Sequence, residues 1–93
     1  MRFPKWAAGD DRLKVKFLIM LMALEADSNG RMTALAKHAE IPYESLMWAI
    51  SNNVTSGMAE KLCKSVPDCG VRPHWLTNPA WIAFDKETGE ITE

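Results

Sequence analysis

One proline separates two short stretches of helical periodicity, and this feature constrains the fold more than any other in the chain. It is Pro42, within the sequence LAKHAEIPYESLMWAI at residues 35–50. Proline cannot continue a helix from before it, but its fixed φ suits the first turn of a new helix. Apolar residues on both sides recur at the spacing of one helix face. Before the proline they are Met32, Leu35, Ala36 and Ala39; after it they are Leu46, Ala49, Ile50 and the aliphatic part of Asn53.

This pattern predicts two helices, at about residues 31–39 and 42–52, joined by a tight turn. The small side chain of Ala36 permits the close backbone approach that two steeply crossing helices need. Such a pair is the organisation of a helix-turn-helix, whose second helix is free to enter a DNA major groove.

Three further helices are expected in the chain. The first runs from a cap at Asp10 or Asp11 to about Asp27, because aspartate favours a helix N-cap. Another runs from a cap at Thr55 or Ser56 to about Val66, and a short one covers residues 72–76, with Trp75 and Leu76 in the core. We therefore predict one all-α domain over residues 1–93, with five helices, an irregular arm at 1–9 and a tail at 80–93.

The tail contains a β-prone stretch at 81–84, followed by turn residues and then residues 90–92. A short C-terminal strand or hairpin is expected there. An isolated hairpin is marginal, so it should pack on the body or pair with another chain. Trp6 of the arm is expected to pack on the body, and Arg2 and Lys5 are placed to lie along DNA.

The helix at about 11–27 carries apolar residues on two opposite sides. One stripe consists of Leu13, Phe17, Met20, Leu21 and Leu24; the other consists of Val15, Ile19, Met22 and Ala26, with Leu18 beside it. A helix that is apolar all round must be covered on both sides. One side should pack on the helix-turn-helix, and the other should meet the arm, the C-terminal segment or a second subunit.

Charge is distributed unevenly along the chain, although the formal net charge is only −1. The first 16 residues hold five basic and two acidic side chains, and the last nine hold one basic and four acidic ones. The chain before the tail therefore carries a small net positive charge, which gives weak support for nucleic-acid binding. The acidity of the tail makes it an unsuitable DNA contact.

Other classes of protein receive little support. No paired carboxylate motif, placed nucleophile or glycine-rich phosphate loop points to an enzyme or a cofactor. Cys63, Cys69, His38 and His74 match no standard zinc spacing, and Cys63 fits core packing better. With no secretory signal and an eight-residue longest apolar run at 17–24, we expect reduced thiols, no membrane span and a cytoplasmic location.

The second predicted helix of the pair has an unusual outer face. Projection at 100° per residue places Glu44, Met47, Trp48 and Ser51 opposite the core stripe, with Tyr43 pointing outward from the first turn. Exposed tryptophan and methionine side by side usually mark an interaction site rather than a plain solvent face.

Residues 31–79 resemble the Cro/phage-repressor (Xre-like) helix-turn-helix family. The segment LAKHAEIPYESLMWAI matches its motif, with Ala36 at the small position, and Gly70-Val71-Arg72-Pro73-His74-Trp75-Leu76 is similar to its closing segment. The resemblance implies a lambda-repressor-like domain that regulates transcription in a bacterium or phage by binding operator double-stranded DNA as a homodimer. Two helices at 42–52 would then lie about one DNA turn apart, ~34 Å.

The resemblance also implies roles for individual residues. Those facing base edges would be Tyr43, Glu44, Met47 and Trp48. Those facing phosphates would be Arg31, Lys37, Ser51, Asn52, Asn53, Thr55 and Ser56.

Two positions depart from the family. Glu40 stands where members usually have glycine, at a turn position that tends to need φ > 0. Glu44 and Trp48 stand where members usually present Gln, Arg, Ser or Asn to the bases. A protein-interaction module on the same scaffold, such as an antirepressor or adaptor, is therefore the alternative function.

Overall fold

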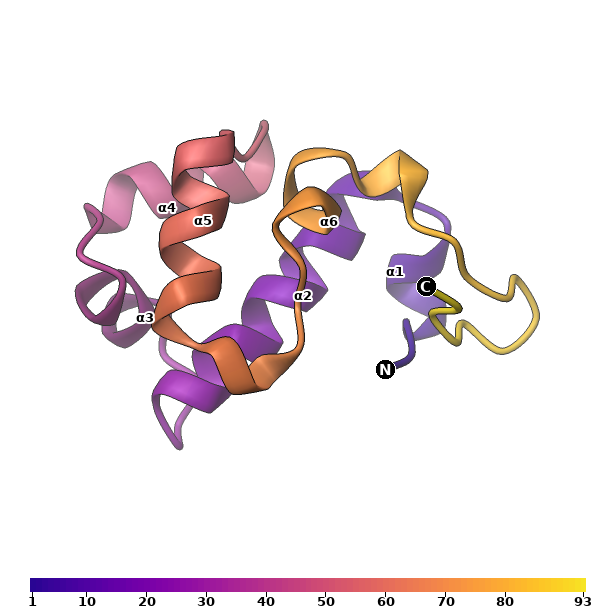
Figure 1. The fold of residues 1–93 in the computed structure, drawn as a ribbon, viewed down its shortest axis with the longest axis horizontal. Coiled ribbons are helices and arrows are strands. Elements are labelled where there is room, and N and C mark those ends of the chain that lie inside the picture. The colour runs from indigo at the N-terminus through magenta and orange to yellow at the C-terminus, as the bar shows by residue number, and fades with distance from the viewer.

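Helix α2 (Asp11–Ala26) is the element on which the rest of the chain packs. In the computed structural model, which describes residues 1–93, it contacts α1, α3, α4, α6 and both short 3₁₀ helices. The predicted cap is confirmed, because the Asp10 carboxylate accepts hydrogen bonds from the N–H groups of Arg12 and Leu13. Figure 1 shows α2 crossing behind α6.

The chain is all-α, with six helices and no strands. The other elements are α1 (Lys5–Ala8), α3 (Met32–His38), α4 (Tyr43–Ser51), α5 (Ser56–Ser65), η1 (Pro67–Cys69), α6 (Pro73–Thr77) and η2 (Pro79–Trp81). The five predicted helices are present, each within one residue of its expected ends. No helix is long and apolar enough to cross a membrane.

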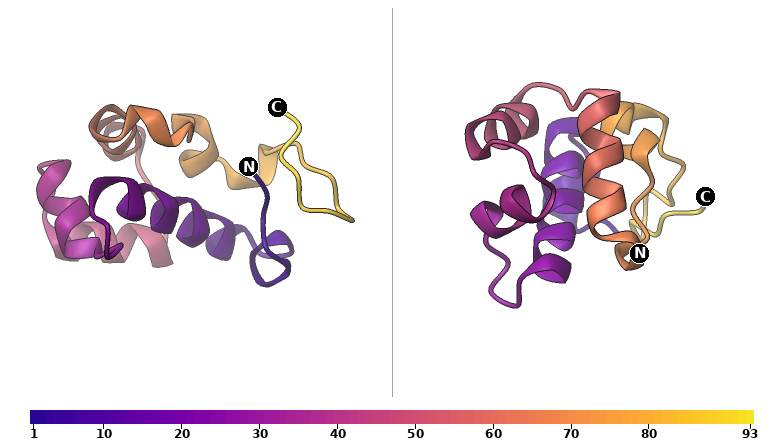
Figure 2. Two further views of the ribbon diagram at one scale, coloured as in Figure 1. Left: turned by 90° about the horizontal axis from the view of Figure 1, so that it is seen from below. Right: turned by 60° about the vertical axis from the view of Figure 1, so that its left-hand side comes forward.

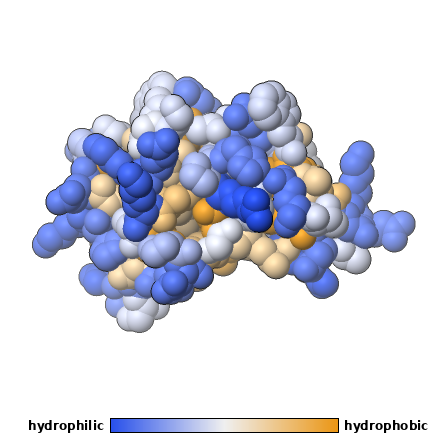
Figure 3. All heavy atoms as spheres, viewed as in Figure 1, coloured by the Kyte–Doolittle hydropathy of each residue, from blue (hydrophilic) through white to orange (hydrophobic).

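A single cluster of 21 buried apolar residues forms the core, and every α-helix contributes to it. Trp75 and Leu76 belong to it, as predicted. On α2 the buried face consists of Val15, Leu18, Ile19, Met22 and Ala23. Hydrophilic residues cover most of the face drawn in Figure 3, and apolar residues reach the surface mainly in its middle.

The α2 stripe that carries Phe17, Met20 and Leu24 is covered along only part of its length. Phe17 lies edge-on to both Phe3 and Trp6, with ring centroids 6.0 Å apart in each pair. The arm therefore covers the middle of the stripe, as expected. Met20 and Leu24, further along the same side, are 38% and 54% exposed.

The arm is not wholly irregular, which corrects the prediction for residues 1–9. Residues 5–8 form the helix α1 after Pro4, whose φ of −68° and ψ of 161° suit a helix N-cap. Its Ala7 is fully buried, while Trp6 stays 48% exposed although it contacts Phe17. A four-residue helix has almost no local stability, so contact with α2 holds it in place.

The tail forms a turn but no strand, which corrects the prediction of a strand at 81–84. Trp81 ends the 3₁₀ helix η2, which Pro79 opens, and the Trp81 side chain is 75% exposed. The turn closes through the Gly89 N–H, which donates to the Asp85 carbonyl at 2.7 Å, and through a single antiparallel bridge between Phe84 and Ile91.

The two ends of the chain are paired with each other. Ile91 donates its N–H to the Met1 carbonyl at 2.9 Å, and Phe3 donates to the Gly89 carbonyl at 2.8 Å. Gly89 is required, because a Cβ there would lie 2.2 Å from the Phe3 oxygen and φ is +81°. Figure 2 shows this terminal pair at the end of the molecule opposite α3 and α4.

Candidate nucleic-acid interface

The turn between α3 and α4 depends on a left-handed residue. Glu40 has φ +58° and is the only non-glycine residue with positive φ, which confirms the expectation for this position. Around it the Ile41 N–H donates to the Ala36 carbonyl at 2.9 Å, and the Glu40 N–H donates to the Lys37 carbonyl at 3.2 Å. These are the two hydrogen bonds of a Schellman motif, which ends α3 and redirects the chain.

Buried side chains fix the inner side of both helices. Leu35 and Ala36 of α3, and Leu46, Ala49 and Ile50 of α4, are buried as the periodicity predicted. Asn53 is exposed, so its expected place in the core stripe is wrong. Val54 is buried instead, 3% exposed, because α4 ends at Ser51 and the backbone turns before the helical spacing reaches Asn53.

All four predicted base-facing residues are exposed on α4. Tyr43 is 43% exposed, Met47 37% and Trp48 57%, and Glu44 is exposed beside them. Tyr43 with Met47, and Glu44 with Trp48, are four residues apart, so they form two neighbouring rows along the helix. The outer face of α4 is thus largely aromatic and apolar, with one carboxylate.

A hollow of about 360 Å³ lies beside Trp48, between α4 and the start of α5. Its lining includes Glu44 and Trp48, which were predicted to face base edges, and Asn53 and Thr55, which were predicted to face phosphates. Met58 of α5 also lines it, and no sequence signal separated this methionine from an ordinary core residue.

The start of α5 is a well-formed helix N-terminus next to that hollow. The Thr55 hydroxyl accepts a hydrogen bond from the Met58 N–H at 3.3 Å, and the first turn carries no acidic residue. The N–H groups of Ser56 and Gly57 have no acceptor within the helix. The positive end of the helix dipole therefore faces solvent with no carboxylate in the first turn of α5.

The seven predicted phosphate-facing residues are all exposed, but Arg31 and Asn52, like the capping Thr55, are engaged within the protein. Arg31 binds Asp27 through two hydrogen bonds, Nε to Oδ2 at 3.0 Å and Nη2 to Oδ1 at 3.2 Å. These bonds lower the pKa of Asp27 and raise that of Arg31. The Asn52 amide donates to the Trp48 carbonyl at 2.9 Å, which closes the end of α4.

Arg12 is a cation near α4 that sequence reasoning missed. Its Nη1 donates to the Ala49 carbonyl at 3.2 Å, although the two residues are 37 positions apart. This contact brings a positive charge from α2 to the C-terminal half of α4. No local pattern in the sequence reveals it, since it depends on how α2 and α4 cross.

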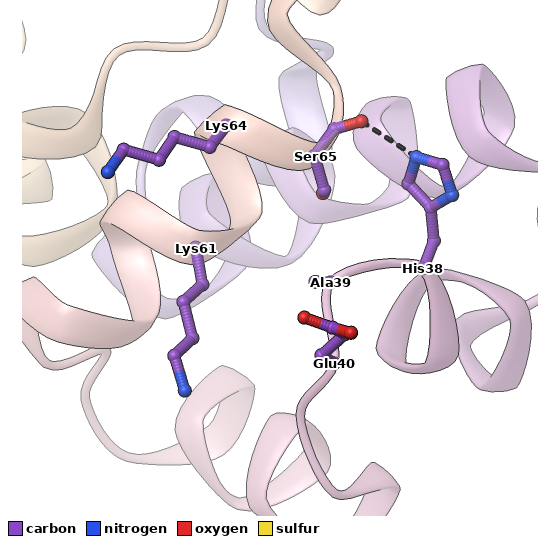
Figure 4. Close-up of a pocket in the computed structure, with 6 residues that line it drawn as sticks. All are labelled: His38, Ala39, Glu40, Lys61, Lys64 and Ser65. Atoms are coloured by element: carbon purple, nitrogen blue, oxygen red, sulfur yellow. Dashed lines mark hydrogen bonds between the residues drawn. The ribbon is translucent and has the colours of Figure 1, made fainter.

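A second pocket lies between the end of α3 and α5, and its polar groups do not converge. It is lined by His38, Ala39, Glu40, Lys61, Lys64 and Ser65. His38 Nε2–H donates to the Ser65 carbonyl at 2.7 Å and so links α3 to α5. Figure 4 shows the Lys61 and Lys64 side chains pointing in different directions. This arrangement does not form a preorganised ligand site.

The two cysteines contact the backbone of Val71. Cys63 donates its S–H to the Val71 carbonyl at 3.3 Å, and both thiols are free and half-buried. Burial raises the pKa of Cys63 to about 11, and burial also raises the pKa of Cys69. Such thiols are poor nucleophiles at neutral pH. No three His, Cys, Asp or Glu side chains lie close enough together to hold a metal ion.

No protein-family model matches the chain, and searches of curated proteins and of solved structures give no match either. The resemblance of residues 31–79 to that family therefore stays a prediction.

Proposed function

We propose that this chain is a DNA-binding transcriptional regulator with a helix-turn-helix of the Cro/phage-repressor type, in which α4 enters the major groove. The observation that carries the proposal is the outer face of α4. Three large side chains, Tyr43, Met47 and Trp48, are exposed on a helix whose inner side is fully anchored. A protruding, rigidly held helix is what direct contact with base edges requires.

Neighbouring groups support contact with the phosphate backbone. Lys37, Ser51, Asn53 and Ser56 are exposed near or beside α4, and the free amides at the start of α5 suit a phosphate oxygen. Arg31 and Asn52 would join them only after giving up the internal hydrogen bonds that hold them. The acidic tail lies at the far end of the molecule, where its charge interferes least.

Binding to a duplex at two or more salt concentrations tests the proposal. Labelled random-sequence duplex should bind at low salt, and log affinity should fall linearly with log salt. Lys37→Ala should weaken binding to all sequences alike and reduce that slope by about one. Lys86→Ala, which removes the same charge from the distant tail, is the matched control and should change little. Absence of binding at low salt would overturn the proposal.

The homodimer is the second part of the proposal, and the uncovered end of the α2 stripe supports it. Met20 and Leu24 have no partner within the chain that buries them. We expect the pure protein to sediment as a dimer at micromolar concentration and Leu24→Glu to sediment as a monomer, because a buried unpaired carboxylate is costly. Thr33→Glu adds the same charge on α3 and should remain dimeric. A monomeric parent protein would contradict this part.

An antirepressor or adaptor is the alternative function, and one observation favours it. The Glu44 carboxylate is exposed within the apolar face of α4 and has no basic partner within 4 Å, so it would meet DNA as a repulsive charge unless a base amino group lies opposite it. If this alternative is correct, Glu44→Gln does not create or strengthen binding to duplex at low salt.

A further inference from the structure

Helix α4 lacks the side chains that read purines. Its exposed positions hold Tyr43, Glu44, Ser45, Met47, Trp48 and Ser51, and the helix contains no Arg, Lys, Asn or Gln. Bidentate recognition of guanine uses Arg or Lys, and bidentate recognition of adenine uses Asn or Gln. If α4 lies in a major groove, it therefore distinguishes sequences by some other contact.

The exposed side chains of α4 suit contact with the thymine methyl group in the major groove. Met47 and Trp48 offer exposed apolar surface, and the C5 methyl of thymine is the only apolar group on a base edge there. The hollow beside Trp48 is also walled by Ala49 and Met58, so a methyl group can be covered from more than one side. The Glu44 carboxylate, in the same row as Trp48, is an acceptor for the N4 amino group of cytosine.

We propose that α4 recognises a pyrimidine-rich strand chiefly through thymine methyl groups packed against Met47 and Trp48. This inference rests on the proposed function and specifies the DNA that it favours. Arg12 holds its guanidinium at the Ala49 carbonyl, on the side of α4 that packs on α2, and the start of α5 lies beside the hollow next to Trp48. The free amides at the start of α5 would therefore meet a phosphate close to the bases that the apolar face contacts.

Removing the methyl group without changing the base pairing tests this reading. Duplexes that bind are first selected from a random pool. The duplex that binds most tightly is then synthesised in three forms: with thymine, with deoxyuridine in place of thymine, and with 5-methylcytosine in place of cytosine. We expect about a fourfold loss of affinity for each contacted thymine that becomes deoxyuridine, the value of one buried methyl group. A 5-methylcytosine beside Glu44 should bind at least as well as cytosine, because it keeps the amino group and adds a methyl.

Variants show which side chains sense the methyl group. Met47→Ala and Trp48→Ala should bring the thymine-to-deoxyuridine ratio of affinities close to one, and Trp48→Phe should keep it. Lys37→Ala should weaken binding to both duplexes equally and leave the ratio unchanged. Circular dichroism of each variant checks that the fold is retained, which the exposure of Trp48 favours.

Each outcome decides between the two proposals. Equal affinities for the thymine and deoxyuridine duplexes would overturn the proposal that α4 recognises thymine methyl groups, and would leave the proposal of DNA binding intact. A selected site rich in guanine at the contacted positions would do the same. Failure of every duplex in the pool to bind at low salt would overturn both.

Discussion

At the scale of single residues, Glu40 shows how an unfavourable backbone conformation serves the turn. Its φ of +58° lies in the left-handed region, where an L-residue other than glycine is strained by its Cβ. The conformation is retained because the Ile41 and Glu40 N–H groups both find acceptors on α3 and because Ala39 and Leu46 are buried on either side of the turn.

Glu40→Gly should therefore stabilise the protein. We expect the free energy of unfolding to rise by up to about 1 kcal/mol, since the relief of strain outweighs the extra freedom of the unfolded chain. Urea unfolding followed by tryptophan fluorescence measures the change. Lys37→Gly, three residues earlier in the last turn of α3, is the control and should lower stability by up to about 1 kcal/mol. A lower free energy of unfolding in Glu40→Gly would contradict the conclusion that Glu40 is strained in this turn.

At the scale of elements, local signals explain most of the helices. Asp10 and Thr55 cap α2 and α5 with their side chains, and Pro42 precedes α4 as the residue that separates it from α3. Each of these effects acts within one helical turn, so the sequence alone predicts it. Helix α1 lies outside this group because nothing local stabilises four residues of helix. The turn in the tail is local, since the Asp85 side chain accepts from the Glu87 and Thr88 N–H groups, but the bridge between Phe84 and Ile91 beyond it is a single pair.

The cap of α5 gives a prediction at this scale. Thr55→Ala should lower the free energy of unfolding by about 1 kcal/mol, because the Met58 N–H then loses its acceptor. Thr55→Ser keeps the hydroxyl and should stay close to the parent protein in the same urea titration. Equal losses in both variants would show that the threonine methyl group, rather than the cap, matters.

At the scale of the whole molecule, Glu93 links the end of the tail to α6 and to the start of the tail. Its carboxylate accepts from His74 Nε2–H at 2.8 Å, from Trp75 Nε1–H at 3.1 Å and from the Ala83 N–H at 3.0 Å. The hydrogen bond from His74, followed by those from Trp75 and Ala83, lowers the pKa of Glu93 to about 2. The contacts tie the tail to α6.

This arrangement predicts a specific dependence of stability on pH. Because the folded pKa is depressed from its ordinary value of 4.5, the stabilisation is complete above about pH 4.5 and is lost as pH falls toward 2. Glu93→Gln should be less stable than the parent at pH 6, and the difference should shrink between pH 5 and pH 2. Glu87→Gln in the exposed turn is the control. A difference that stays constant over this range would exclude the carboxylate as its source.

The part of the candidate site that lies on α4 could be predicted from the sequence. Ordinary α-helical periodicity within α4 separates Tyr43, Met47 and Trp48 from Leu46, Ala49 and Ile50, and the structure places each on its expected side. Arg12 and Met58, which complete the surroundings of α4, come from other helices. Their positions depend on crossing angles that no local pattern encodes.

Local patterns predict where α2 to α6 begin and end and which face of α4 points outward, because periodicity, caps and proline act over a few residues. How the ends of the chain are held depends on tertiary contacts. Phe3 meets Phe17 and Phe84, and Gly89 meets the Phe3 backbone, across up to 86 positions of the chain. Such contacts form only after the helices have packed and brought these segments together, so the sequence pattern around each of them carries no sign of its partner.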